Sequence, residues 1–148
     1  MAKKTGSIKN FNVYYNKLLD YAKLMSITIY FHKIEDQGTF FNRTIYLDKT
    51  LNEKQILAVL LHELGHFIDE MINPKRYISK RAVQAYTLLA KNKEMTQLQK
   101  QNILIIEKAA CEYGKVLAKK LKIKTGSWYK KEMDELINTY KSIKTKSF

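Results

Sequence analysis

The chain has 148 residues, of which 45% are hydrophobic and 28% charged, and it carries a formal net charge of +13. This size and composition are typical of a single globular domain, here spanning residues 1–148. The single cysteine, Cys111, excludes an intrachain disulfide and a four-cysteine zinc site. No apolar run has the length of a signal peptide or a membrane-spanning helix, so we expect a cytoplasmic protein with no membrane partner.

The first third of the chain is predicted to contain one helix and two strands. Residues 1–9 are polar and are expected to be loose. Apolar residues recur at helical spacing over 10–25, which predicts an amphipathic helix. Residues 26–34 and 39–47 are rich in β-branched and aromatic side chains and are separated by a turn sequence at 36–38. They are predicted to be two strands of a hairpin or a small sheet.

A central helix is predicted next. Thr50 and Glu53 fit a capping box at its start, and the helix is expected to end at Ile72, before Asn73 and Pro74. Apolar residues cover most of its circumference, which is typical of a helix at the centre of a fold.

The remaining chain is predicted to be helical. Helices are expected over 79–91 and over 96–121, the second opened by a capping box of Thr96 and Gln99. Gly126 and Ser127 are predicted to break the chain and cap a last helix, and residues 144–148 are expected to be loose. The predicted fold class is α+β, mostly helical, with a small N-terminal sheet.

The predicted central helix contains the sequence His62-Glu63-Leu64-Gly65-His66. The spacing places two imidazoles one turn apart on one face, so His62 and His66 can bind one metal ion. Glu63 can reach a water on that ion, take its proton and pass it to a leaving amine. The motif therefore predicts a zinc peptidase that uses a Glu63-activated, zinc-bound water. A pair of exposed or hydrogen-bonded histidines is the alternative, which so apolar a helix disfavours.

A catalytic zinc site needs a third protein ligand. Asp69 and Ile72 stand where the extended motif HExxHxxGxxH has glycine and histidine, so that solution is excluded. We favour Glu107 on the 96–121 helix, because small residues on its face let two helices approach closely. Those small residues are Ala110, Cys111, Gly114 and Ala118. Glu112, about 140° round the helix, is the competing candidate, and ligation by Cys111 is a further alternative.

Other residues are candidates for supporting roles. Asp69 lies one turn past His66 and is a candidate to hydrogen-bond a ligand or a neighbour, with a solvated or capping role as an equal alternative. His32, Tyr113 or another of the ten tyrosines is a candidate to stabilise an oxyanion. The strand at 44–47 is a candidate edge that aligns an extended peptide by main-chain pairing.

Residues 45–47 and 56–66, which read IYL and ILAVLLHELGH, resemble the ImmA/IrrE-type metallopeptidases of bacteria, mobile elements and phages. The later Glu107-x-x-Ala110 is similar to that family's Glu-x-x-Ala motif, whose glutamate supplies the third zinc ligand. The resemblance implies a zincin-like fold of the gluzincin type, with Zn²⁺ on His62, His66 and Glu107. It also implies a protein substrate such as a transcriptional repressor. Cys111 stands where many gluzincins have aspartate or asparagine.

Two alternative functions stay open from the sequence. One is a catalytically silent, zinc-containing binding module. The other is a basic, nucleic-acid-associated protease, because a net charge of +13 favours anionic partners. The lysines are scattered along the chain, which is also what an AT-rich coding sequence produces, so nucleic acid is an expected but secondary partner.

Overall fold

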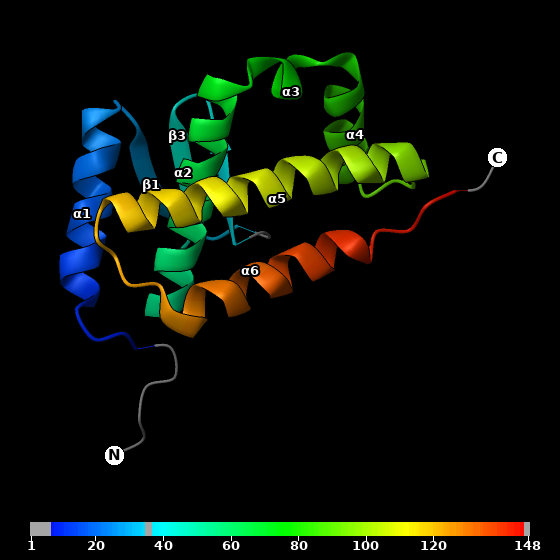
Figure 1. The fold of residues 1–148 in the computed structure, drawn as a ribbon. Helices are drawn as coiled ribbons and strands as arrows, with labels where there is room; N and C mark the ends of the chain where they lie inside the picture. The colour runs from blue at the N-terminus through cyan, green and yellow to red at the C-terminus, as the bar shows by residue number, and fades with distance from the viewer. Residues whose placement is uncertain (1–6, 35–36, 147–148) are drawn as a thin grey trace.

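The computed structural model describes residues 7–34 and 37–146, so the predicted loose ends lie outside the described residues at 1–6 and 147–148. The described chain is α+β and mostly helical, with a small sheet near its N-terminus, as predicted (Figure 1). Its elements are α1 (Phe11–Leu24), β1 (Thr28–His32), β2 (Gly38–Phe41), β3 (Thr44–Asp48), α2 (Glu53–Ile72), α3 (Pro74–Ile78), α4 (Lys80–Ala90), α5 (Gln97–Lys120) and α6 (Gly126–Lys141). No helix in these two ranges is long and apolar enough to cross a membrane.

The predicted strand over 39–47 is wrong, because this segment is a β-hairpin. Residues Asn42 and Arg43 have φ values of 50° and 56° and form the turn between the antiparallel strands β2 and β3. Positive φ at both central residues matches the right-handed twist of the flanking strands. Such turns usually contain glycine, and Arg43 is not a residue type that indicates a turn. Residues 39–47 therefore resemble one continuous strand in the sequence.

The sheet order decides between the two predicted arrangements, in favour of a small sheet. The strand order is β1-β3-β2, with β1 parallel to β3, so the two predicted strands do not form a hairpin with each other. Strand β3 is central and has neighbours on both sides. The prediction that residues 44–47 form a free edge is therefore wrong, and the sheet edges are β1 and β2.

The N-terminus of α2 lies two residues later than predicted. Asn52 Oδ1 accepts a hydrogen bond from the Gln55 backbone N–H at 2.9 Å, and Gln55 Oε1 accepts one from the Asn52 N–H at 3.0 Å. The predicted box of Thr50 and Glu53 is wrong because both side chains bond elsewhere. Thr50 donates to Asp48 at 2.6 Å, and Glu53 accepts from the Ile8 backbone N–H at 3.0 Å. The predicted Thr96 and Gln99 box of α5 is confirmed.

Residues near the first and last described positions contact other parts of the chain. Ile8 packs against the main core as well as bonding to Glu53. At the other end, the Lys146 N–H donates to the Met95 carbonyl at 2.9 Å, beside a bridge between Met95 and Thr145. Helix α6 begins at Gly126, so the predicted cap Ser127 lies inside the helix. Residues 7–9 and 144–146, which are predicted to be loose, thus include positions that contact the rest of the chain.

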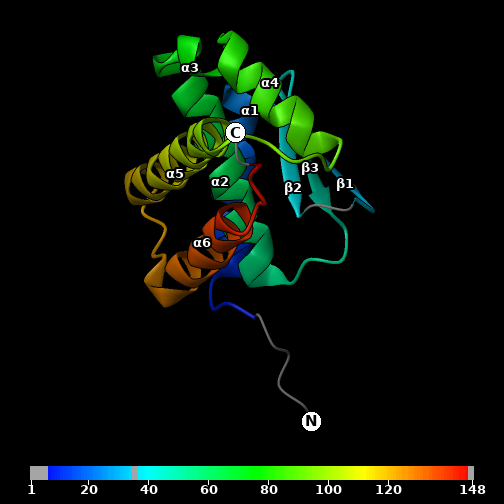
Figure 2. The same ribbon diagram turned by 90° about the vertical axis from the view of Figure 1, so that its right-hand side faces the viewer.

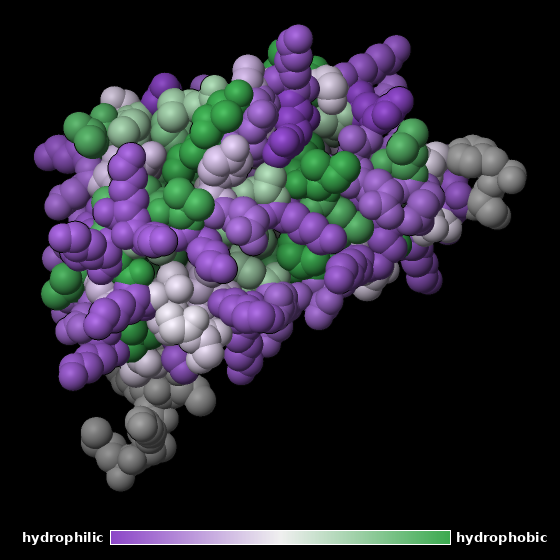
Figure 3. Space-filling model, in the orientation of Figure 1, coloured by the Kyte–Doolittle hydropathy of each residue, from purple (hydrophilic) through white to green (hydrophobic). Residues whose placement is uncertain are grey.

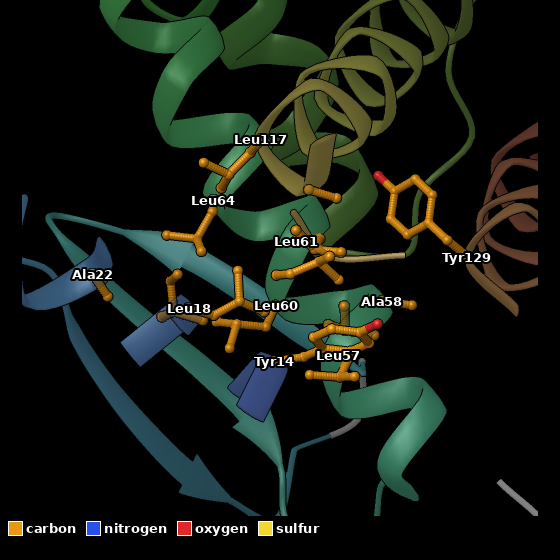
Figure 4. Close-up of a cluster of buried hydrophobic side chains, with 14 of the residues drawn as sticks. Tyr14, Leu18, Ala22, Leu57, Ala58, Leu60, Leu61, Leu64, Leu117 and Tyr129 are labelled. Carbon is orange, nitrogen blue, oxygen red and sulfur yellow. The ribbon is translucent and has the colours of Figure 1, made fainter. Parts of the chain in front are cut away.

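Helix α2 lies between the sheet on one side and α5 and α6 on the other (Figure 2). Its residues from Leu57 to Gly65 are all buried. Figure 4 shows side chains of α1, α5 and α6 meeting it in one cluster. The labelled members are Tyr14, Leu18, Ala22, Leu57, Ala58, Leu60, Leu61, Leu64, Leu117 and Tyr129. The middle of this helix is therefore buried on all sides, as predicted, while Met71 and Ile72 at its end are exposed, and the motif lies in the middle of the molecule.

Candidate metal centre

Helices α2 and α5 cross at a point where both backbones lack bulky side chains. A Cβ atom on Gly65 would collide with the Ala110 carbonyl oxygen and lie 2.9 Å from the Gly114 nitrogen. A Cβ atom on Gly114 would lie 2.7 Å from the Leu61 carbonyl oxygen. Two helices at such short range bring a short carboxylate on one within reach of imidazoles on the other. The small-residue face predicted beside Glu107 is confirmed as a helix contact.

The crossing brings His62, His66 and Glu107 together. One ligand atom from each residue lies within 4.8 Å of the other two, so the three could hold a metal ion. The Glu107 Oε1 atom is 2.9 Å from His62 Nε2. Its Oε2 atom is 3.1 Å from His66 Nε2. In the described part of the chain this is the single group of such side chains with that geometry.

Tyr77 of α3 orients the His66 ring. Its hydroxyl donates to Asp69 Oδ2 at 2.8 Å and lies 3.1 Å from His66 Nδ1. A phenol has one proton, and this proton points to Asp69. The oxygen therefore accepts from the Nδ1–H of His66. That arrangement fixes the tautomer in which Nε2 carries the lone pair of a neutral His66, which is the form that binds metal.

Asp69 is fully buried and accepts three hydrogen bonds. Besides Tyr77, its partners are Arg76 Nη1 at 2.9 Å and Asn73 Nδ2 at 2.9 Å. Three donors satisfy the buried charge, and together they tie α2 to α3. The predicted role of hydrogen-bonding a neighbour is confirmed, and the solvated alternative is wrong.

Tyr86 of α4 forms a hydrogen bond with Glu107, the third residue of the candidate metal site. Its hydroxyl donates to Glu107 Oε2 at 2.6 Å. The sequence contains ten tyrosines and no local pattern that separates Tyr77 and Tyr86 from the rest. Both were missed for that reason. A carboxylate that binds a metal still has lone pairs that need hydrogen-bond donors. A search for tyrosines in the sequence between His66 and Glu107 could therefore have found Tyr77 and Tyr86.

Cys111 contacts His62 but is not one of the three residues that could hold a metal ion. Its Sγ atom lies 3.4 Å from His62 Nδ1, on the opposite side of the ring from Glu107. Burial raises the pKa of the Cys111 thiol to about 12, with Glu107 adding to the effect. The thiol thus stays protonated near neutral pH and offers His62 a weak hydrogen-bonding partner. Direct ligation by Cys111, the alternative considered above, is not supported.

Charges in the site are strongly coupled. Burial opposes protonation of His66, yet the Glu107 carboxylate outweighs it and raises the pKa of His66 to about 9. Burial likewise opposes ionisation of Glu107, but His66 and His62 hold the pKa of Glu107 well below its usual range. Without a metal the site is therefore an ion pair at neutral pH, and a cation bound there would take the place of the His66 proton.

Glu63 is buried at 5% exposure beside the first histidine. Its charge contributes to the raised pKa values of both His66 and Cys111, after the larger effects of burial and of Glu107. Glu63 is thus a carboxylate close to His62, His66 and Glu107 that is not itself one of these three residues.

Three other candidates lie away from the donors. Glu112, the competitor for third ligand, is exposed to solvent. His32 is exposed on β1, where its ring lies 6.1 Å from that of Tyr30 and 6.0 Å from that of Tyr46. The Tyr113 hydroxyl accepts from Asn73 at 3.4 Å. None of the three takes part in the cluster.

Comparisons with protein-family models, curated proteins and solved structures find no match for this chain. Its function is therefore inferred from the site itself.

Proposed function

We propose that the chain is a zinc-dependent endopeptidase of the gluzincin type with a zincin-like fold. The observation that carries the proposal is the convergence of His62, His66 and Glu107 from two crossing helices. Glu63, which follows His62 on the same helix, supplies the carboxylate that peptide hydrolysis requires. The HExxH sequence at 62–66, followed later in the chain by Glu107 in a Glu-x-x-Ala sequence, agrees with the resemblance to ImmA/IrrE-type metallopeptidases.

The donor set suits zinc. Two imidazole nitrogens and one carboxylate oxygen form the ligand set of many catalytic zinc sites. Non-haem iron also binds two histidines and a carboxylate. We favour zinc because Glu63 stands next to the first histidine, where a proton acceptor serves hydrolysis. The hydrogen bonds to Tyr77 and Tyr86 hold a ligand ring and the ligand carboxylate, as ligands of a bound metal require.

When bound, zinc supplies Lewis acidity towards a peptide carbonyl and towards water. Glu63 takes a proton from the attacking water as the oxygen bonds to the carbonyl carbon. It then delivers that proton to the peptide nitrogen as the C–N bond breaks, so the products are a carboxylic acid and an amine. Glu107 would hold the metal as a carboxylate, with the charge of the cation in place of the His66 proton. Tyr86 keeps the Glu107 carboxylate in one orientation during the reaction.

The substrate is proposed to be a protein, and by resemblance a transcriptional repressor. The experiment uses the zinc-loaded chain, a diverse peptide mixture, and mass spectrometry to identify new termini. We expect cleavage by the wild type and none by Glu63→Gln, with zinc content unchanged. Glu70→Gln, an exposed glutamate on the same helix, is the matched control and should cleave normally. Cleavage that survives in Glu63→Gln would falsify the assigned mechanism.

Burial of the donors favours one second candidate, a zinc-containing binding module without turnover. The side chains of His62 and Glu107 are each 3% exposed, and that of His66 is 12% exposed. A peptide must reach the metal in order to be cleaved, and the burial of these three side chains restricts that access. Zinc bound at one ion per chain, with no cleavage of any peptide by the wild type, would favour this candidate.

A further inference from the structure

The C-terminal part of α5 and the loop after it are unusually rich in lysine. Between Glu112 and Glu132 the chain has seven lysines and no acidic residue. Five of these lysines lie on the last turns of α5 or in the loop to α6, and all five are exposed. We call them the basic end. They are Lys115, Lys119, Lys120, Lys122 and Lys124.

A sixth lysine concentrates the charge further. Lys17 of α1 donates through Nζ to the carbonyl oxygen of Leu121 at 2.9 Å and to that of Lys122 at 3.5 Å. Helix α1 therefore lies against the end of α5. Figure 3 shows hydrophilic residues over most of this face, including the left-hand side, where α1 and this end of α5 lie in the same orientation in Figure 1.

The positive charges of the basic end are not neutralised within the described residues. No carboxylate there lies within 4 Å of any of the five ammonium groups. Lys130, one turn into α6, differs because it pairs with Asp134 at 2.6 Å. Cations near a helix C-terminus interact favourably with its carbonyls, but Lys17 already bonds to the carbonyls of Leu121 and Lys122, just past the end of α5. The remaining charge repels itself and is available to an anionic partner.

The composition of the basic end selects the class of partner. Protein interfaces are enriched in aromatic residues and arginine and depleted in lysine. Residues 115–124 contain neither arginine nor an aromatic residue. A membrane-surface helix needs a broad outward apolar face, whereas Leu117 and Ala118 of α5 are buried in the core. Lysine is a compact point charge that suits phosphate oxygens without reading bases.

We propose that the basic end binds double-stranded nucleic acid through its phosphates, without reading sequence. This activity is separate from the metal centre. Twelve residues separate Glu107 from Lys119 on one helix, which is about 18 Å along the axis. Lysines of the basic end can therefore be changed without touching a metal donor, and the inference does not depend on peptidase activity.

The test measures binding of the full chain to a fluorescent DNA duplex of about 20 base pairs and mixed sequence, at roughly 50 to 200 mM salt. We expect a dissociation constant on the order of micromolar at the lowest salt, weakening steeply as salt rises. The slope of log K against log salt should be about −4 to −5 if five lysines each neutralise one phosphate.

A pair of charge-matched variants locates the surface. Changing the five lysines of the basic end to glutamine should weaken binding at low salt by at least about tenfold and remove most of the slope. The control variant changes five exposed lysines on other elements to glutamine and should lose far less affinity. These are Lys49, Lys75, Lys80, Lys91 and Lys93. Both variants carry a net charge of 13 − 5 = +8.

A footprint on the unmodified protein guards against misfolded variants. Lysines of the basic end should be acetylated more slowly when duplex DNA is present, and the control lysines should not. The proposal is overturned by absence of DNA binding at low salt, by equal losses in the two variants, or by protection spread evenly over all lysines. Binding to vesicles with anionic lipid, without binding to DNA, would also overturn it and indicate a membrane surface instead.

Discussion

The hydroxyl of Tyr86 lies 2.6 Å from Glu107 Oε2 and donates to it. The bond joins α4 to α5 and leaves Glu107 Oε1 facing His62 at 2.9 Å. The proposed third metal ligand thus depends for its orientation on a helix that carries no part of the metal-binding motif.

Removing the Tyr86 hydroxyl should weaken zinc binding without abolishing it. In Tyr86→Phe the carboxylate loses its partner and gains freedom to rotate, so we expect about a 10- to 100-fold rise in the zinc dissociation constant. Competition titration against a chelating dye measures it. Tyr46→Phe, a partly buried tyrosine on β3, is the control. Equal affinities for wild type and Tyr86→Phe would show that this bond does not hold the ligand.

Removing the Glu107 carboxylate should abolish tight zinc binding. Glu107→Gln keeps the size of the side chain but loses the charge that pairs with both histidines, so we expect affinity to fall by more than about 100-fold. The matched control is Glu112→Gln, which changes an exposed glutamate five residues along the same helix. Metal analysis after gel filtration gives the zinc content of each. If Glu112→Gln loses zinc and Glu107→Gln keeps it, the assignment of the third ligand is wrong.

The stability of the metal-free protein should depend on pH through the His66–Glu107 pair. The pKa of His66 is raised from 6.5 to about 9, so its contribution is complete below pH 6.5 and is lost as pH rises through about 9. The pKa of Glu107 is lowered from 4.5, so its contribution is present above pH 4.5 and is lost as pH falls further. The pair should therefore stabilise the metal-free chain most between pH 4.5 and 6.5.

Zinc affinity should follow the opposite trend, because the ion displaces the His66 proton. Between about pH 7 and 9 we expect the apparent affinity to rise up to about tenfold per pH unit, with protons released on binding. Urea unfolding with and without zinc, at several pH values, measures both effects. A metal-free stability that is as high at pH 10 as at pH 6 would contradict the coupling.

The α2–α5 crossing should not accept a single added methyl group. Alanine in place of glycine normally stabilises a helix by about 1 kcal/mol. In Gly65→Ala, however, the new Cβ meets the Ala110 carbonyl oxygen, and backbone atoms cannot move aside as a flexible side chain can. We expect a loss of about 2 kcal/mol or more in the free energy of unfolding, together with weaker zinc binding. Unfolding by urea tests this, and a stabilised Gly65→Ala variant would contradict the close approach.

Local patterns in the sequence were sufficient for much of the site. The spacing of His62 and His66 is a property of one helix, and helical periodicity can be read from consecutive residues. Glu107 could be predicted for a related reason. Small residues three, four, seven and eleven positions later mark a helix face that permits close contact with another helix. The structure confirms that face at Gly114 and buries Glu107, while Glu112 is exposed.

Local patterns failed where the outcome depends on distant partners. Thr50 and Glu53 satisfy the sequence rule for a capping box, but Asp48 and the Ile8 N–H compete for them. Arg43 adopts a positive φ because the paired strands β2 and β3 impose the turn, and its residue type gives no sign of it.

The sequence by itself predicted the long helices, the fold class and the three residues of the candidate metal site, because each rests on spacing within one segment. Only the tertiary structure decided that β3 is the central strand and that Tyr77 and Tyr86 support the donors. Strand pairing and hydrogen bonds between helices join residues far apart in the chain. Their free energy depends on how those segments meet in space, and no local pattern of residues encodes that meeting.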